Sequence, residues 1–313
     1  TSTFGVQERT RDPKFLSAFE YGSLYNEALT NQGDEPLYTQ EELELFRNGS
    51  DPDNYPNTNW FSVLNKTALI QTYNISANGG SEKIQYATSF GVLDQDGIVP
   101  NDNFKRYNFR SNIDANVTNT TRLSFDVSGR DERITSIGAP EVFRGLTSTR
   151  PDMQPIKWSN GGYSNGPAYL TLPENGYRRE GIQAFKGRIE LEQKLPVEGL
   201  TVRGIAAYDK TLTDVKNWSY VKIPFYTQDG NGGFQESVSG ADAPSSLYQS
   251  NNDFQSLTLQ AHINYERSLG DSDISALALY TQTQEKWKFL SAFRDGYTLA
   301  IDEIDFGGTA NRN

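Results

Sequence analysis

The chain has 313 residues, no cysteine, 35% hydrophobic residues and a formal net charge of −11. The acidic balance argues against nucleic-acid binding, which needs a basic surface, and the missing cysteines exclude a disulfide framework or a thiolate metal site. No apolar run in the sequence approaches the roughly 20 residues of a transmembrane helix. Abundant Tyr and Phe, with 17 of each, indicate an all-β extracytoplasmic protein, either a secreted sandwich or an outer-membrane barrel.

Residues 13–47 form the one segment with helical character. The stretch PKFLSAFEYGSLYNEAL has a loose apolar face, and TQEELELF opens with Thr39 and Glu42 at the spacing of a capping box. The loop-forming stretch RNGSDPDNYPNTNW follows, because its prolines disfavour regular structure. We therefore expect a helical and loop excursion over 13–60, before the strands begin.

From residue 71 onward, apolar and polar residues alternate with a period of two, which predicts antiparallel strands. The predicted strands cover 72–78, 84–92, 107–117, 123–128, 183–195, 200–208, 257–266 and 274–287. Several aromatic residues lie near the ends of these strands, where an aromatic girdle would meet the membrane surface. They are Tyr73, Tyr107, Tyr208, Tyr265 and Trp287.

The connections between the predicted strands alternate between short and long. The short ones are 79–83, 118–121, 196–199 and 269–273, and the long ones are 93–104, 131–181 and 211–253. Every second connection of an antiparallel meander lies at the same end, so the tight turns gather at one end and the long loops at the other. Outer-membrane barrels show this asymmetry, with short periplasmic turns and long extracellular loops, and it argues against a sandwich.

No set of residues indicates covalent chemistry or a metal centre. His262 is the single histidine, and one histidine completes neither a catalytic triad nor an ordinary zinc site. Glu190 and Glu192 resemble the carboxylate pair of a glycosidase, but we favour the interpretation that they line a charged wall in contact with water. Neighbouring cations are expected to form ion pairs with such carboxylates rather than bind anionic cargo: Lys186, Arg188 and Arg203. We expect no catalytic residue, no metal site and no cofactor.

The two longest predicted loops, 131–181 and 211–253, hold the candidate ligand-binding residues. Aromatic faces stack on sugar rings, and Asn, Asp and Gln form hydrogen bonds with sugar hydroxyl groups. The candidates are Trp158, Tyr163, Tyr169, Tyr177, Trp218 and Tyr220. The alternatives are packing within the loops or contact with a partner protein.

Three stretches of the sequence resemble one family. GSDPDNYPNTNW, QTYNISANGGSEKIQYATSFGVLDQDGIV and FKRYNFRSNIDANVTNTTRLSFDVSGR are similar, in this order, to the early barrel region of SusC-like, TonB-linked outer-membrane transporters of Bacteroidetes. The resemblance covers residues 14–130. It implies a barrel of about 22 strands, energy delivered by TonB, and a SusD-like surface lipoprotein as partner. It also implies a glycan oligosaccharide as typical cargo, with peptides less common.

We therefore expect 1–313 to be a partial TonB-dependent receptor β-barrel domain, a fragment from which the plug domain, the TonB box and the signal sequence are absent. The predicted function is active nutrient import across the bacterial outer membrane, foremost of a glycan oligosaccharide, with no enzymatic activity and with outer-membrane lipid around the wall. Two alternatives stay open: a secreted all-β carbohydrate-binding or adhesin module, and a soluble β-rich glycoside hydrolase.

Overall fold

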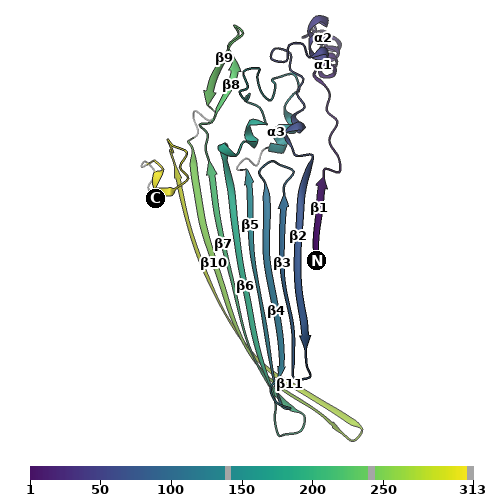
Figure 1. Ribbon diagram of the computed structural model, residues 1–313, viewed down its shortest axis with the longest axis vertical. Helices are drawn as coiled ribbons and strands as arrows, with labels where there is room; N and C mark the ends of the chain where they lie inside the picture. Colours follow the sequence, from purple (N-terminus) through teal and green to yellow (C-terminus); the bar gives the residue numbers. More distant parts are fainter. Residues whose placement is uncertain (138–141, 239–243, 309–313) are drawn as a thin grey trace.

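The computed structural model describes residues 1–137, 142–238 and 244–308. Its main element is an antiparallel sheet of nine strands in the order β1-β2-β3-β4-β5-β6-β7-β10-β11, which stand side by side as one wall (Figure 1). The strands are β1 Ser2–Glu8, β2 Thr67–Gly80, β3 Ile84–Asp96, β4 Asn103–Asn116, β5 Thr121–Ile137, β6 Gly176–Lys194, β7 Leu200–Ser219, β10 Ser246–Leu269 and β11 Ser272–Asp295. The antiparallel, strand-dominated fold predicted from the alternation is confirmed.

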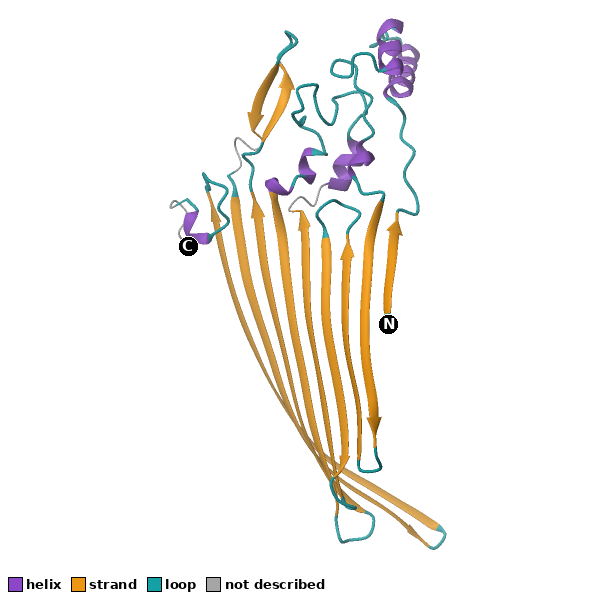
Figure 2. Ribbon diagram, in the orientation of Figure 1, coloured by secondary structure: helices purple, strands orange, loops and turns teal. Residues whose placement is uncertain are grey.

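The smaller elements form a cap at one end of the wall (Figure 2). They are the helices α1 Ala18–Gln32, α2 Gln40–Asn48 and α3 Val142–Ser148, the 3-10 turns η1 Trp60–Val63, η2 Tyr169–Thr171, η3 Pro173–Asn175 and η4 Ile304–Phe306, and the hairpin of β8 Pro224–Gln228 and β9 Phe234–Val238. Ser17 and Thr39 begin α1 and α2, each in a complete capping box with the glutamate three residues later. None of the described helices is long and apolar enough to cross a membrane.

The tight turns and the long connections lie at opposite ends of the wall, as predicted (Figure 2). The turns are 81–83, 117–120, 195–199 and 270–271, and in the last Gly270 adopts a left-handed φ of 60° that suits a two-residue hairpin. One predicted long connection is wrong. Only 97–102 separates β3 from β4, because Gln95 pairs with Phe104 and Asp96 with Asn103.

Several strands run further toward the cap than the sequence pattern indicates. β5 and β6 extend to Ile137 and from Gly176, so the loop expected over 131–181 narrows to 138–175. β7 ends at Ser219 and β10 begins at Ser246, which narrows 211–253 to 220–245. Residues 138–141 and 239–243 of these loops lie outside the described residues. Polar and apolar residues no longer alternate in these strand ends, because both faces carry a mixture of the two, although the backbone pairing between the strands continues.

The register sorts the side chains onto two faces, because directly paired residues of neighbouring strands point to the same side of a sheet. Ile113, Phe125 and Ile189 are paired in one row, and the adjacent row contains Asn112, Asp126 and Arg188. The apolar side chains of the first face are largely exposed. We call this apolar face the outer face and the polar one the inner face, as in a membrane barrel whose lumen is wet.

The apolar band on the outer face slopes across the wall. Following the pairs from strand to strand, Tyr73 of β2 is level with Lys288 of β11. Tyr73 is central in the outer apolar stretch of β2, 69–77, whereas the outer apolar stretch of β11 is 274–280, centred eleven residues below Lys288. The centre of the apolar band is therefore about 36 Å lower on β11 than on β2, measured along the strands, and these two strands are about 34 Å apart across the sheet. This slope corresponds to a strand tilt of about 45°, as membrane barrels require.

Candidate functional site

The lower half of the inner face carries a ladder of ion pairs. Arg188 contacts Asp126 of the neighbouring strand at 3.3 Å and Glu190 of its own strand. Arg203 contacts Glu190 at 3.2 Å and Glu192 at 2.9 Å. The ion pairing expected of these arginines is confirmed, and both glutamates are engaged by cations. Partly exposed pairs contribute at most about 1 kcal/mol each to stability, so their main effect is a polar wall of alternating charge, in which two arginines face three carboxylates.

A cavity of about 800 Å³ lies on the inner face, across β4 to β7. Its charged lining consists of four cations, Arg110, Arg130, Lys186 and Arg188, and two carboxylates, Asp126 and Asp209. Lys186 lies 4.0 Å from Asp209, the limit of an ion pair, and the Nε of Arg110 donates to the amide oxygen of Asn112 at 3.0 Å. This part of the wall therefore offers hydrogen-bond donors to a polar ligand in the lumen.

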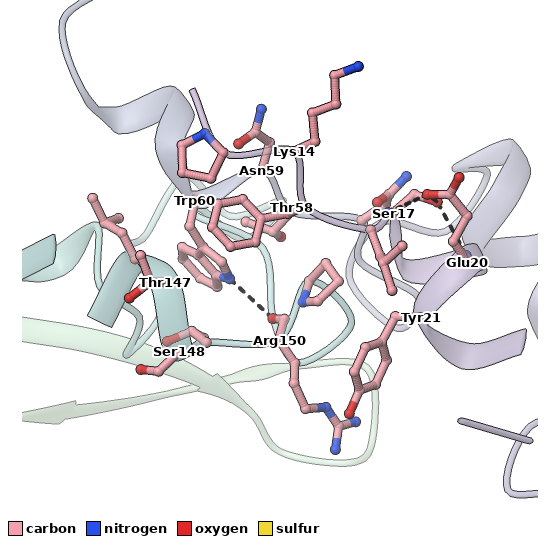
Figure 3. Close-up of a pocket in the computed structure, with 17 residues that line it drawn as sticks. Lys14, Ser17, Glu20, Tyr21, Thr58, Asn59, Trp60, Thr147, Ser148 and Arg150 are labelled. Carbon is pink, nitrogen blue, oxygen red and sulfur yellow. Dashed lines mark hydrogen bonds between the residues drawn. The ribbon is translucent and has the colours of Figure 1, made fainter. Parts of the chain in front are cut away.

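A second cavity, of about 690 Å³, lies in the cap where three segments distant in the sequence meet: 13–21, 57–60 and 146–151 (Figure 3). Trp60 is buried, and its indole Nε1 donates to the carbonyl oxygen of Arg150 at 3.1 Å. The guanidinium carbon of Arg150 lies 5.0 Å from the ring centre of Tyr21. Aromatic walls with a few hydroxyl, amide and charged groups are typical of small-ligand sites.

A charged network holds one edge of this cavity. Arg150 donates to both carboxylate oxygens of Asp152, at 3.0 and 2.6 Å, and Tyr38 donates to the same carboxylate at 2.5 Å. Burial acts to raise the pKa of Asp152, but the hydrogen bonds from Arg150 and Tyr38 outweigh it, so the pKa is lowered. Burial and the neighbouring carboxylate raise the pKa of Tyr38 to about 12. The network ties α1 and α2 to the segment after α3.

Trp158 and Tyr163 lie in the loop between β5 and β6, next to the β8–β9 hairpin. Trp158 is buried, its Nε1 donates to the carbonyl oxygen of Tyr226 at 2.6 Å, and its ring centre lies 5.6 Å from that of Phe234. Tyr163 is half-buried, and the Nζ of Lys157 lies 4.4 Å from its ring centre. The indole of Trp158 thus joins the loop to the hairpin, while part of Tyr163 stays open.

Tyr169 packs in the same loop region and is 2% exposed. Its hydroxyl donates to the carbonyl oxygen of Ile223, its ring meets that of Phe225 edge-on at 5.9 Å, and burial raises its pKa to about 12. Loop packing, one of the two alternatives weighed for these rings, is therefore what the structure shows for Tyr169 and Trp158.

Tyr177, Trp218 and Tyr220 form a separate group at the rim. Tyr177 and Trp218 are paired across β6 and β7 on the outer face, not toward the lumen. Trp218 is 5% exposed, stacked with Tyr220 at 5.8 Å and edge-on to Tyr297 at 4.8 Å. The hydroxyl of Tyr177 donates to Asp302. The six candidate residues therefore form two groups rather than one site, and their binding of cargo stays a prediction.

One residue expected in the aromatic girdle points the other way. Tyr73, Tyr107, Tyr208 and Tyr265 share the outer face, although Tyr73 lies at the centre of the outer apolar stretch of β2 rather than at its edge. Trp287 pairs with Phe254 on the inner face. The sequence places Trp287 near a strand end, yet only the register shows its face. The assignment of Trp287 to a lipid-facing girdle is wrong.

His262 lies on the inner face, with its Nε2 3.5 Å from the side-chain oxygen of Gln260. Across the described ranges, no group of three His, Asp or Glu side chains is arranged to hold a metal ion. Sequence reasoning missed the cap cavity, because its three segments carry no shared motif. The Asn57 to Trp60 stretch inside the family-like GSDPDNYPNTNW was the one available signal.

Comparisons with known proteins agree with this architecture. No family model matches the chain. The TonB-dependent receptor P26 of Formosa agariphila is 33% identical over 105 residues, which is 32% of this chain and 10% of the receptor. The TonB-dependent receptor SusC of Bacteroides thetaiotaomicron is 35% identical over 57 residues, 18% of this chain and 6% of SusC.

A solved structure titled as the RagAB peptide transporter matches the fold with a TM-score of 0.74, at 16% identity, over 99% of this chain and 37% of that chain. The chain thus spans about a tenth of the first curated relative and just over a third of the solved one. The nine-stranded antiparallel wall matches a part of that chain in fold. The chain is thus similar in sequence, over part of its length, to TonB-dependent receptors that include SusC, and in fold to a segment of the RagAB transporter.

Proposed function

We propose that the protein containing this chain imports a nutrient across the bacterial outer membrane, driven by TonB. The sloping apolar band on the outer face is the observation that carries the proposal, because only a tilted wall in lipid needs it. The polar inner face then lines the lumen, and the cap lies on the extracellular side. A secreted carbohydrate-binding or adhesin module is not favoured, since it has no need for a broad, exposed apolar face.

The strands described here supply wall and loops, and no residue of the chain is assigned covalent chemistry. Cargo binds at the extracellular mouth, a SusD-like lipoprotein closes over it, and TonB acts on a plug elsewhere in the parent protein. We propose a glycan oligosaccharide as cargo, on the aromatic and amide-rich character of the loops and on the resemblance to SusC. A peptide is the second candidate, since the solved neighbour is titled a peptide transporter.

The orientation is tested with single cysteines, because the chain contains none. Lys157→Cys and Lys222→Cys lie in the cap, and Lys83→Cys and Glu198→Cys lie in the tight turns; all four native side chains are exposed. Each variant of the full-length protein is treated in intact cells with a membrane-impermeant maleimide. Labelling of the first two only, with the turn variants labelled after the outer membrane is opened, is the expected result.

The parent protein without an introduced cysteine measures the background. Equal labelling of all four positions in intact cells would overturn the transporter proposal, as would release of the protein into the medium. Release of the protein would instead support the alternative of a secreted carbohydrate-binding or adhesin module.

A further inference from the structure

The cavity of about 800 Å³ on the inner face owes its shape to a contrast in side-chain size. In one row of the sheet, Ser128 of β5 is paired with Arg110 of β4 on one side and with Lys186 of β6 on the other. Each cation therefore begins one strand spacing of about 4.8 Å from the serine. Small side chains form the floor of the cavity, and long cationic ones surround it. The small ones are Ser128, Ala184 and Ala207, and the cations are Arg110, Arg130, Lys186 and Arg188.

Positive charge exceeds negative charge in this cavity. The chain has a net charge of −11, yet four cations and two carboxylates are found among the described residues that line the cavity. Asp126 is engaged by Arg188 at 3.3 Å, and Asp209 lies 4.0 Å from Lys186, at the limit of an ion pair. The ion-pair ladder below it has the opposite balance, with two arginines and three carboxylates.

Arg110 is the least neutralised arginine of the cavity. Arg130 lies 3.5 Å from Glu132, whereas no ion pair reaches Arg110 within the described ranges. The Nε of Arg110 donates to the amide oxygen of Asn112 at 3.0 Å, and the amide nitrogen of Asn112 donates to Asp126. Asn112 therefore orients the guanidinium group and stands between it and that carboxylate. The two terminal nitrogens of Arg110 remain as a fork of donors toward the lumen.

A second arginine of β4 lacks a carboxylate partner in the part of the chain that the structure describes. Arg106 lies four residues nearer the cap than Arg110 and on the same face, about 14 Å away along the strand. Its Nε is buried and finds no hydrogen-bond partner there. Glu132 is in register with Arg106 but contacts Arg130. β4 thus presents two guanidinium groups to the lumen that are available to an anion.

We propose that this cavity binds the acidic group of an anionic oligosaccharide, either a uronate carboxylate or a sulfate ester. This inference rests on the proposed import function and specifies its cargo. The oxyanion lies between Arg110 and Lys186 and over Ser128, because both cations are long enough to span one strand spacing. The fork of Arg110 matches two oxygens of a carboxylate or a sulfate. Asn108 and Thr211 of the same lining offer amide and hydroxyl groups to the sugar hydroxyls.

The test measures binding to the full-length transporter in detergent by titration calorimetry. One pair of probes is hexagalacturonate and its neutral methyl ester, and the other is a sulfated galactan hexasaccharide and its desulfated form. Within each pair the sugar rings are the same, so the pair isolates the contribution of the acidic group. We expect the acidic member of at least one pair to bind more tightly than its neutral form.

Arg110→Gln should weaken binding of that acidic probe about tenfold or more and leave the neutral probes unaffected, because it removes a charge-assisted hydrogen bond. Arg110→Lys keeps the charge and should retain part of the affinity. Arg122→Gln is the matched control. Arg122 lies on the inner face of β5 below the cavity, and its guanidinium group is paired with Asp114 at 2.9 Å. Its loss removes the same charge and should change the affinity by less than about twofold.

Equal affinity of wild type and Arg110→Gln for every acidic sugar that binds overturns the site, and so does the failure of all acidic sugars to bind. Hexaglutamate is titrated in parallel, and binding of this peptide alone, weakened by Arg110→Gln, overturns the sugar assignment. A carboxylate of the plug is the other source of an oxyanion. Faster hydrogen exchange in the plug of Arg110→Gln, with sugar affinity unchanged, would assign the site to the plug and overturn the proposal. The cysteine labelling described above reports separately on the import function.

Discussion

Leu259 of β10 gives the sharpest test of the two faces. The outer apolar stretch of β10 covers 257–265, so Leu259 lies two residues from its centre at Ala261. At a tilt of about 45°, two residues of about 3.3 Å each place it within about 5 Å of the bilayer midplane. Arginine at that depth costs about 2–4 kcal/mol. We therefore expect Leu259→Arg to reduce the unfolding free energy of the barrel by that amount.

The assay is urea unfolding of the intact barrel in phospholipid vesicles, with equilibrium shown from both directions. Gln260→Arg is the inner-face control and should change stability by less than about 0.5 kcal/mol, as an ordinary substitution facing water does. Gln255→Arg lies on the outer face above the apolar stretch and should cost at most about 1 kcal/mol. Equal costs at 259 and 260, or a larger cost at 260, would refute the assignment of the faces.

Three further outcomes are expected. Asp152→Asn should lower the local stability of the cap by about 1–3 kcal/mol, which is measured as faster amide hydrogen exchange there. The pKa of Asp152 in the folded protein lies below its ordinary value of 3.8, so the carboxylate contributes its full stabilisation above pH 3.8 and loses it as the pH falls through the folded pKa. Gly129→Ala should lower the melting temperature, since its Cβ would lie 2.1 Å from the ring of Phe109, whereas Gly181→Ala meets nothing within 4 Å and should not. Tyr297→Ala, at a residue 1% exposed, should expose 296–308 to protease in detergent-solubilised protein, and unchanged digestion would contradict its packing role.

The sequence predicts the fold best where the two faces of a strand differ in polarity. Where one face is apolar and the other polar, Phe185, Ile189 and Leu191 alternate with polar residues, so the strand can be predicted from its pattern. Above the band both faces meet water, and the alternation vanishes although the ladder continues to Ile137 and Ser219. β1 was not predicted, because its seven residues form a strand by pairing with the edge of β2, and the sequence does not show that pairing.

The candidate site was less predictable than the fold. Aromatic content marked Trp158 and Tyr169 correctly as loop residues, but composition cannot tell a ring that packs from one that binds. Tyr38 and Asp152 are 114 positions apart, and no local pattern joins them. Trp287 required the register, because one position along a strand exchanges the two faces.

The ion-pair ladder has an electrostatic consequence for movement through the lumen. Arg188 and Arg203 each contact two carboxylates, so positive and negative charge alternate over a few ångströms along the wall. The potential of such alternating dipoles decays much faster with distance than that of an unpaired charge. The alternation shortens the range over which each of these charges acts, while the side chains can still exchange hydrogen bonds with a polar molecule that touches the wall. For the import proposed above, this part of the wall would therefore present paired rather than isolated charges to a passing cargo.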